Sequence, residues 1–209
     1  LSKYLDYPLT TVPDPFKICN SFGEHNNAKL VEFLNRFNLP FTFQSSTEAY
    51  KSGVFNETIK KILLNYEKIL NVVLPTLGED RRKTYSPFFP IDENTGKILQ
   101  VPVNEINTDD FTISFTHEGK NYVKSVLDGQ CKLQWKVDWA MRWAAFGVDY
   151  EMCGKDLTES YVLSSKICRI IGSKPPENLI YELFLDENAE KISKSKGNGI
   201  SIDDWLKYS

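Results

Sequence analysis

The sequence predicts an α/β fold in which a parallel strand–helix–strand unit follows an α+β region that contains an antiparallel β meander. Two changes of hydrophobic period support this prediction. Apolar residues recur at helical spacing over the first third of the chain, alternate with a period of two from about residue 97 to 133, and then return to helical spacing. In the last third a strand, a helix and a second strand succeed one another, which is the pattern of a parallel sheet.

The first part of the chain predicts helices with one short strand. Residues 1–20 contain three prolines and are expected to be extended. Ser21 and Glu24 have the spacing of a capping box, so a helix is expected to start there and to run through Phe37. A strand is predicted over residues 41–44 and a helix over 56–73, whereas the basic run 81–83 is expected in a solvated loop.

The middle and last parts predict the sheets. Alternating apolar residues around 111–115 and turn residues at 118–121 and 128–129 indicate the meander. After it we expect these elements in order: a helix over 136–146, a strand over 148–153, a tight turn over 154–156, a helix closed by Gly172, and a strand over 181–185.

Composition excludes several classes of protein. A chain of 209 residues with 41% hydrophobic and 25% charged residues is globular, and it is long enough for one large domain or two small ones. No apolar run is long enough to cross a membrane, and the N-terminus does not resemble a signal peptide. The net charge of −3 gives no support for a nucleic-acid surface, although it does not exclude RNA as a partner.

The cysteines argue against a metal site and for a reducing compartment. The four cysteines form no C-x-x-C pair and the two histidines are scattered, so neither zinc nor another protein-bound metal is expected. Unpaired cysteines fit the cytosol. Because the chain starts at Leu1 rather than at Met, we expect it to be a piece of a longer protein.

The strongest candidate for chemistry is the lysine-rich segment KISKSKGN, which starts at Lys191. Lysines supply positive charge, hydroxyls supply donors, and glycines allow a close approach of the backbone, so the segment suits a polyphosphate. Composition alone is equally compatible with a solvated lysine loop.

A second candidate is the turn Gly154-Lys155-Asp156 at the end of a predicted strand. Ligands of open α/β sheets bind at the carboxyl ends of the strands, where an Asp can accept hydrogen bonds from ribose hydroxyls. The alternative is that Asp156 and Glu159 simply cap the helix that follows.

A third candidate is the helix that carries Trp135, Trp139 and Trp143, which recur every four residues. Trp135, Asp138 and Trp139 could form an acidic pocket with aromatic walls, which suits an amino acid with a cationic side chain. The alternative is an aromatic core stripe beside a surface ion pair between Asp138 and Arg142.

Taken together, these segments resemble one family. KISKSKGN is similar to the KMSKS signature of class I aminoacyl-tRNA synthetases. The longer runs KLQWKVDWAMRWAAFGVDYEMCGKDL and PPENLIYELFLDENAEKISKSKGNGIS resemble class I lysyl-tRNA synthetases of the bacterial type, as do PLTTVPDPF, SFGEHNNAKL, SSTEAYKSG and TYSPFFPI. The chain departs from the family at residues 17–20 and at Leu157, where many relatives have His. The family's His-x-Gly-His motif and its helical anticodon-binding domain have no counterpart in these residues.

The resemblance implies a fold and an activity. Residues 134–209 would be the second half of a Rossmann-like parallel sheet, and residues 1–133 a connective insertion. The implied reaction is ATP-dependent activation of lysine to lysyl-adenylate and transfer to tRNA(Lys), with Mg²⁺ accompanying ATP and with the remaining segments of the synthetase as partners. Lys191 and Lys194 would contact the β- and γ-phosphates, and ATP would also contact Gly154, Asp156, Ser193 and Ser195. Lysine would contact Trp135, Asp138 and Trp139.

Two other functions are left open by the sequence. One is a different class I synthetase, such as a methionyl or cysteinyl enzyme, and the other is a non-catalytic binding module derived from a synthetase. Amino-acid-dependent pyrophosphate exchange separates these possibilities.

Overall fold

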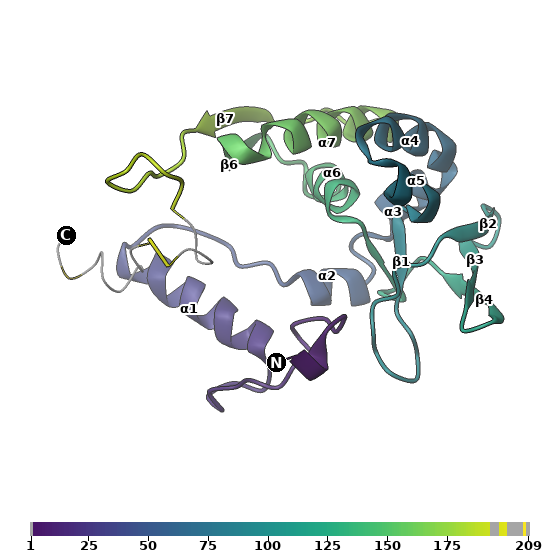
Figure 1. Ribbon diagram of the computed structural model, residues 1–209, viewed down its shortest axis with the longest axis horizontal. Coiled ribbons are helices and arrows are strands. Elements are labelled where there is room, and N and C mark those ends of the chain that lie inside the picture. The colour runs from purple at the N-terminus through teal and green to yellow at the C-terminus, as the bar shows by residue number, and fades with distance from the viewer. Residues whose placement is uncertain (1, 193–196, 200–206, 208–209) are drawn as a thin grey trace.

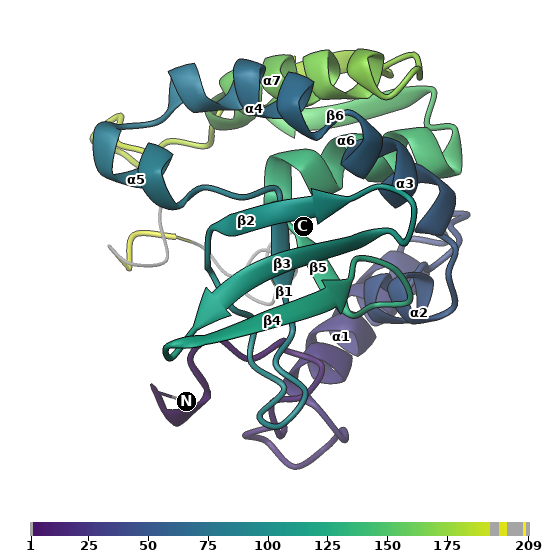
Figure 2. The same ribbon diagram turned by 90° about the vertical axis from the view of Figure 1, so that its right-hand side faces the viewer.

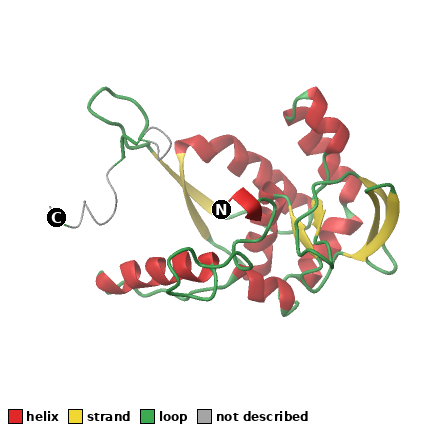
Figure 3. Cartoon of the chain, turned by 60° about the horizontal axis from the view of Figure 1, so that its bottom comes forward, coloured by secondary structure: helices red, strands yellow, loops and turns green. Residues whose placement is uncertain are grey.

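A computed structural model of the 209-residue chain describes residues 2–192, 197–199 and 207. It is a mixed α/β fold with antiparallel and parallel sheets (Figures 1 and 3), which confirms the predicted class at that level. The α-helices are α1 (Phe22–Arg36), α2 (Ser46–Lys51), α3 (Asn56–Leu64), α4 (Tyr66–Val73), α5 (Glu79–Thr84), α6 (Trp135–Phe146) and α7 (Thr158–Ile170), with 3₁₀ turns η1 (Ser2–Tyr4), η2 (Leu74–Thr76) and η3 (Lys155–Leu157). The strands are β1 (Phe88–Pro90), β2 (Val103–Asn107), β3 (Thr112–His117), β4 (Lys120–Ser125), β5 (Cys131–Leu133), β6 (Tyr150–Gly154) and β7 (Glu177–Tyr181).

The predicted meander is present as three antiparallel strands in the order β2-β3-β4 (Figure 2). Ile113 and Phe115 on β3 face the core and are 0% and 3% exposed. The chain then leaves this sheet through Asp128 and Gly129, which both have positive φ angles. It pairs as β5 with β1. The last part of the predicted meander therefore belongs to a separate two-stranded ladder.

The parallel unit of the last third is also present, with its second strand shifted. β6 pairs in parallel with β7, from Tyr150 opposite Glu177 to Gly154 opposite Tyr181, and α7 makes the crossover. The prediction of a strand over 181–185 was wrong, because the ladder begins directly after Pro176 and ends where β6 ends. Residues 182–185 instead lead into a hairpin that is closed by a bridge between Leu185 and Lys191.

Three other local predictions differ from the structure. Residues 41–44 pair with no strand among the described residues, so the predicted strand was wrong. The helix predicted over 56–73 is broken at Asn65, whose side chain donates to the Lys61 carbonyl oxygen at 2.9 Å. The basic run 81–83 lies in the last turn of α5 rather than in a loop, where positive side chains complement the helix dipole.

The start of α1 is as predicted. The Ser21 hydroxyl accepts a hydrogen bond from the Glu24 backbone N–H at 3.1 Å, which caps the first turn. The Glu24 carboxylate accepts in return from the Asn20 N–H at 3.1 Å.

One hydrophobic core joins the two regions on either side of residue 133. It lies between α3, α4, α6 and α7 and the β1–β5 ladder, and its largest fully buried side chains include Trp143, Phe55, Phe88, Ile62, Leu133 and Met141. α6 packs on α7 and α3, and α7 packs on α4. The candidate site residues on α6 and β6 are therefore held by the core itself. No helix in the described part of the chain is long and apolar enough to span a membrane.

Phe55 tests how strongly this core holds α6. Its ring is fully buried and lies 5.0 Å from the Tyr50 ring and 5.3 Å from the Phe146 ring. We expect Phe55→Ala to lower the free energy of unfolding by about 3–5 kcal/mol, because it removes buried surface and leaves a cavity. The neighbouring exposed Val54 is the matched control, and Val54→Ala should change stability by less than about 0.5 kcal/mol. Equal losses from both variants in denaturant unfolding would contradict this account.

Candidate functional site

The predicted turn Gly154-Lys155-Asp156 lies at the carboxyl end of β6. β6 ends at Gly154, and η3 carries Asp156. A Cβ atom at Gly154 would lie 2.8 Å from the Asp156 carboxylate oxygen Oδ1 and 3.5 Å from the side chains of Leu183 and Tyr181. A side chain at Gly154 would therefore require the Asp156 carboxylate to shift.

Asp156 and Lys191 are brought together by this turn and the hairpin that follows β7. The Lys191 Nζ atom lies 2.6 Å from Asp156 Oδ2, although the two residues are 35 positions apart in the chain. The hydrogen bond from the Lys191 ammonium holds the pKa of the Asp156 carboxyl below its ordinary value. Both side chains are about half exposed, at 51% and 43%, so a ligand in solution has access to each.

The capping interpretation of Asp156 is not what the structure shows. The residue before α7 is Leu157, and no side chain caps that helix. The Asp156 carboxylate is directed to Lys191 instead.

Asp186 holds the hairpin that carries Lys191. Its carboxylate accepts hydrogen bonds from the backbone N–H groups of Asn188 and Glu190 and from the Asn198 side chain at 2.6 Å. The Ile192 N–H donates to the Phe184 carbonyl oxygen at 3.1 Å. Glu190, just before the lysine-rich segment, and Asn198 at its end are thus bonded to one carboxylate. The predicted site residues Ser193, Lys194 and Ser195 lie outside the described residues.

The three tryptophans of α6 form a ladder of rings. Trp135 stacks on Trp139 with centroids 5.3 Å apart, and Trp139 contacts Trp143 at 4.9 Å. Trp143 is 1% exposed, whereas Trp135 is 43% exposed at the start of the helix. The stripe is therefore a core stripe at one end and an open aromatic surface at the other.

The acid beside this ladder is Glu151 of β6 and not Asp138. Glu151 Oε2 accepts hydrogen bonds from the indole N–H of Trp139 at 3.0 Å and of Trp143 at 2.7 Å. Sequence reasoning did not single out Glu151. The available signal was a glutamate in a strand opposite a helix rich in indole donors, since buried indole N–H groups need an acceptor.

Asp138 of α6 is directed toward α2. Its two carboxylate oxygens accept from the Tyr50 hydroxyl at 2.5 Å and from Arg142 Nε at 2.5 Å. Burial, and then the neighbouring Asp138 carboxylate, raise the pKa of Tyr50 well above its usual range. Arg142 also donates to the Ser46 hydroxyl at 2.8 Å, and the Leu133 N–H donates to the Tyr50 oxygen. The structure thus shows the Asp138–Arg142 ion pair and does not place Asp138 between Trp135 and Trp139.

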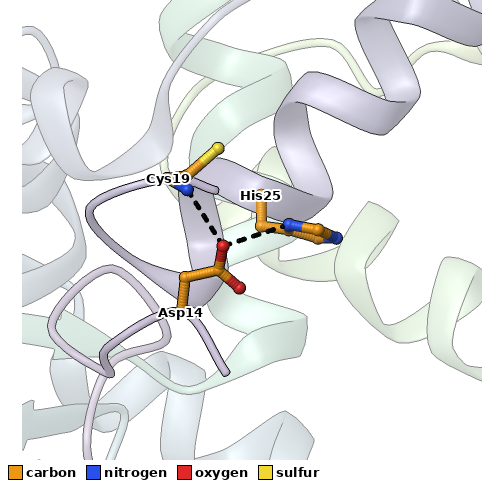
Figure 4. Close-up of side chains that lie close together, drawn as sticks. All are labelled: Asp14, Cys19 and His25. Carbon is orange, nitrogen blue, oxygen red and sulfur yellow. Dashed lines mark hydrogen bonds and ion pairs between the residues drawn. The ribbon is translucent and has the colours of Figure 1, made fainter. Parts of the chain in front are cut away.

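A third cluster lies at the start of α1 and joins Asp14 and Cys19 of the preceding loop to His25 on the helix (Figure 4). His25 Nδ1 lies 3.2 Å from Asp14 Oδ2, and one ligand atom from each residue lies within 4.8 Å of the others. Carboxylate, thiolate and imidazole are zinc ligands, so these residues could hold such an ion. The expectation of no zinc stays a prediction. Cys19 and His25 are the one near Cys–His pair in the sequence, and their segment predicts the entry to a helix; the structure adds Asp14 to them.

Backbone donors surround the Asp14 carboxylate. It accepts from the N–H groups of Phe16, Ile18 and Cys19 at 2.9–3.1 Å. Burial works to raise the pKa of this carboxyl, but these three N–H groups together with His25 bring it from 3.8 down to about 2. The ionised carboxylate therefore fixes the loop that leads into α1.

Low pH should destabilise the loop that the Asp14 carboxylate holds before α1. Because the pKa of Asp14 is lower in the folded chain than in the unfolded chain, its contribution to stability is present above about pH 4 and disappears as the pH falls toward 2. We expect Asp14→Asn to make the melting temperature less dependent on pH between about 5 and 2. The exposed Asp109, changed to Asn, is the control and should leave the wild-type slope intact. Parallel slopes for the wild type and Asp14→Asn would refute this role.

The Asp138 network should matter for stability. We expect Asp138→Ala to destabilise the fold by about 3 kcal/mol, since it leaves the Arg142 guanidinium and the Tyr50 hydroxyl without their acceptor. Asp149→Ala, at an exposed carboxylate on the loop after the same helix, should have little effect. Chemical denaturation of both variants measures the difference, and a stable Asp138→Ala protein would show that the network contributes little.

Comparison with known proteins covers the whole chain. The family described as tRNA synthetases class I (K) matches residues 1–209. The chain is 54% identical over 207 residues to the lysine–tRNA ligase of Rickettsia akari, covering 99% of the chain and 39% of that protein. It is 55% identical to the lysine–tRNA ligase of Rickettsia felis with the same coverage, and 53% identical over 210 residues to that of Rickettsia africae. The chain thus spans about two fifths of the length of these relatives. A match along its entire length shows that this chain belongs to the class I (K) family of tRNA synthetases.

Proposed function

We propose that the complete protein carrying this chain is a lysine–tRNA ligase, which activates lysine with ATP and transfers it to tRNA(Lys). The observation that carries the proposal is the Asp156–Lys191 pair at the carboxyl end of a parallel strand pair. Open α/β sheets bind their ligands at that edge. Membership of the synthetase family and relatives named as lysine–tRNA ligases support the same activity.

In this proposal β6 and β7 belong to a larger Rossmann-like sheet, with residues 134–209 as its second half and 1–133 as the connective insertion. One face of the strand pair carries Glu151, which bonds the tryptophans of α6, while the other face exposes Tyr150, Met152, Leu179 and Tyr181 by 47–60%. Parallel sheets are normally covered on both faces. Further segments of the complete protein would cover this exposed face. The shared hydrophobic core would hold the insertion against residues 134–209.

ATP would occupy the edge formed by Gly154, Asp156 and Lys191. The Asp156 carboxylate would accept hydrogen bonds from the ribose hydroxyls, while Gly154 leaves room for the sugar. Lys191, together with Lys194, Ser193 and Ser195, would contact the phosphates. Both side chains of the Asp156–Lys191 pair are about half exposed, so water already competes for their hydrogen bonds. The ribose hydroxyls of ATP can therefore take the place of Lys191 at Asp156, and the phosphates can take the place of Asp156 at Lys191.

Mg²⁺ would enter with ATP, bound to the phosphate oxygens and neutralising part of their charge. We assign the Asp156 carboxylate, which already pairs with Lys191, to the ribose rather than to the metal ion.

Lysine would lie against the open end of the tryptophan ladder, formed by Trp135 and backed by Trp139. An aromatic face attracts an ammonium group. Asp138, the third residue predicted to contact lysine, would act by holding α6 against α2, because both of its carboxylate oxygens already have partners.

The chemistry needs no covalent bond to the protein. The lysine carboxylate attacks the α-phosphorus of ATP, and pyrophosphate leaves to give lysyl-adenylate. The terminal adenosine 2′-hydroxyl of tRNA then loses its proton and attacks the lysyl carbonyl carbon, and AMP leaves as the ester bond to tRNA forms. The chain's task is to orient the substrates and to stabilise the charge that develops on the phosphates. Such a reaction belongs to translation in the cytoplasm, and the free cysteines agree with that location.

Lysine-dependent ATP–pyrophosphate exchange by the complete protein tests the proposal. We expect Asp156→Asn to raise the KM for ATP about tenfold with little change in the KM for lysine, because it weakens the acceptor for ribose. Lys191→Ala and Lys194→Ala should lower the exchange rate on the order of 100-fold, since a charge contact that strengthens in the transition state is lost.

Matched controls lie at the opposite end of the same strands. Asp149→Asn and Lys174→Ala change exposed residues before β6 and before β7 and should leave exchange unchanged. Exchange with methionine or cysteine in place of lysine would assign the protein to another class I synthetase. A folded complete protein without exchange for any amino acid would instead identify a non-catalytic module.

A further inference from the structure

Glu151 is in an unusual position for a glutamate, because a single carboxylate oxygen holds two tryptophans. The indole N–H groups of Trp139 and Trp143 both donate to Oε2, at 3.0 and 2.7 Å. The backbone of the same residue is also fixed, since its carbonyl oxygen accepts from the Asn178 side chain of β7 at 3.0 Å. Glu151 therefore ties the rings of α6 to the parallel strand pair.

The ladder held by Glu151 is attached to the strand whose end forms the edge where ATP is proposed to bind. Glu151 accepts from the two indoles, and β6 ends three residues later at Gly154. At about 3.3 Å per strand residue, Glu151 lies about 10 Å along the strand from that end. The tryptophan rings are therefore held by the same strand that carries the proposed ATP edge.

The rings transmit this fixation to the exposed end of the ladder. Trp143 is buried and also contacts the Tyr161 ring at 5.4 Å, so it cannot move without disturbing α7. Trp139 is held by its N–H at one edge and lies between Trp143 and Trp135. Trp135 itself is 43% exposed, and one face of its ring stacks on Trp139.

We infer that Glu151 is a positioning residue for lysine: it fixes the ring of Trp139 and thereby sets the place of Trp135, the exposed aromatic wall of the amino-acid pocket. This inference rests on the proposed function, because it names a residue that shapes the same site. Glu151 acts through the indole of Trp139 and does not touch the substrate.

The test compares variants of the complete protein in lysine-dependent pyrophosphate exchange. Glu151→Leu removes the acceptor, whereas Glu151→Gln keeps an amide oxygen that can accept from both indoles. Trp139→Phe retains a ring in the ladder but removes its N–H, and it serves where Glu151→Leu does not fold. Trp143→Phe is the matched control, since it also loses one hydrogen bond to Glu151 but its ring is not stacked on Trp135.

We expect Glu151→Leu and Trp139→Phe to raise the KM for lysine about tenfold while the KM for ATP stays the same. Glu151→Gln and Trp143→Phe should keep a KM for lysine close to that of the wild type. A purely structural role would lower the melting temperature without separating the two KM values, and that result would overturn the inference. So would a Glu151→Gln protein as impaired as Glu151→Leu, because the negative charge itself would then be required.

The two proposals fail in different ways. If the wild-type protein shows no lysine-dependent exchange, the proposed function is wrong, and so is the positioning role of Glu151. If the wild type is active and the variants do not separate lysine from ATP, only the role of Glu151 is wrong.

Discussion

The parallel pairing of β6 with β7 is the constraint on which the candidate site depends. Parallel strands cannot be joined by a tight turn, so the chain must cross over through α7, and both strands then end at the same edge. This brings the Gly154 turn beside Tyr181, and the hairpin held by Asp186 returns Lys191 to Asp156. A single pairing therefore assembles groups that are 35 residues apart.

How much of the fold could be predicted follows from how local each signal is. The capping box of Ser21 and the periodic helix α6 depend on neighbours within a few residues, and both are as expected. The errors concern long-range choices. Whether residues 177–181 or 181–185 form β7 is decided by the length of β6, and whether 131–133 joins the meander is decided by β1, which lies more than forty residues earlier. Patterns within one segment carry no information about such partners.

The same distinction applies to the candidate site. Asp156 and Lys191 could be proposed because the order of elements places both at one sheet edge. Glu151 and the Asp14 cluster could not, because their roles arise from side-chain directions that no spacing rule describes. Asp138 shows the converse: it lies three residues after Trp135, on a neighbouring part of the helix surface, yet its carboxylate is directed to Tyr50 of α2. On a helix, residues one apart differ in direction by about 100°, so Asp138 and Trp139 cannot face the same ligand easily.

α6 is consequently anchored on two sides by two different acids. Asp138 connects it through Tyr50 and Arg142 to α2 and β5, which lie in the first 133 residues, and Glu151 connects it through the indoles to the parallel strands. A movement of α6 would have to break one of these sets of hydrogen bonds, in which buried groups would lose their partners. The open ring of Trp135 starts this helix, so its position is fixed jointly by both parts of the chain. The position of this aromatic wall therefore depends on the shared core and not on either part of the chain alone.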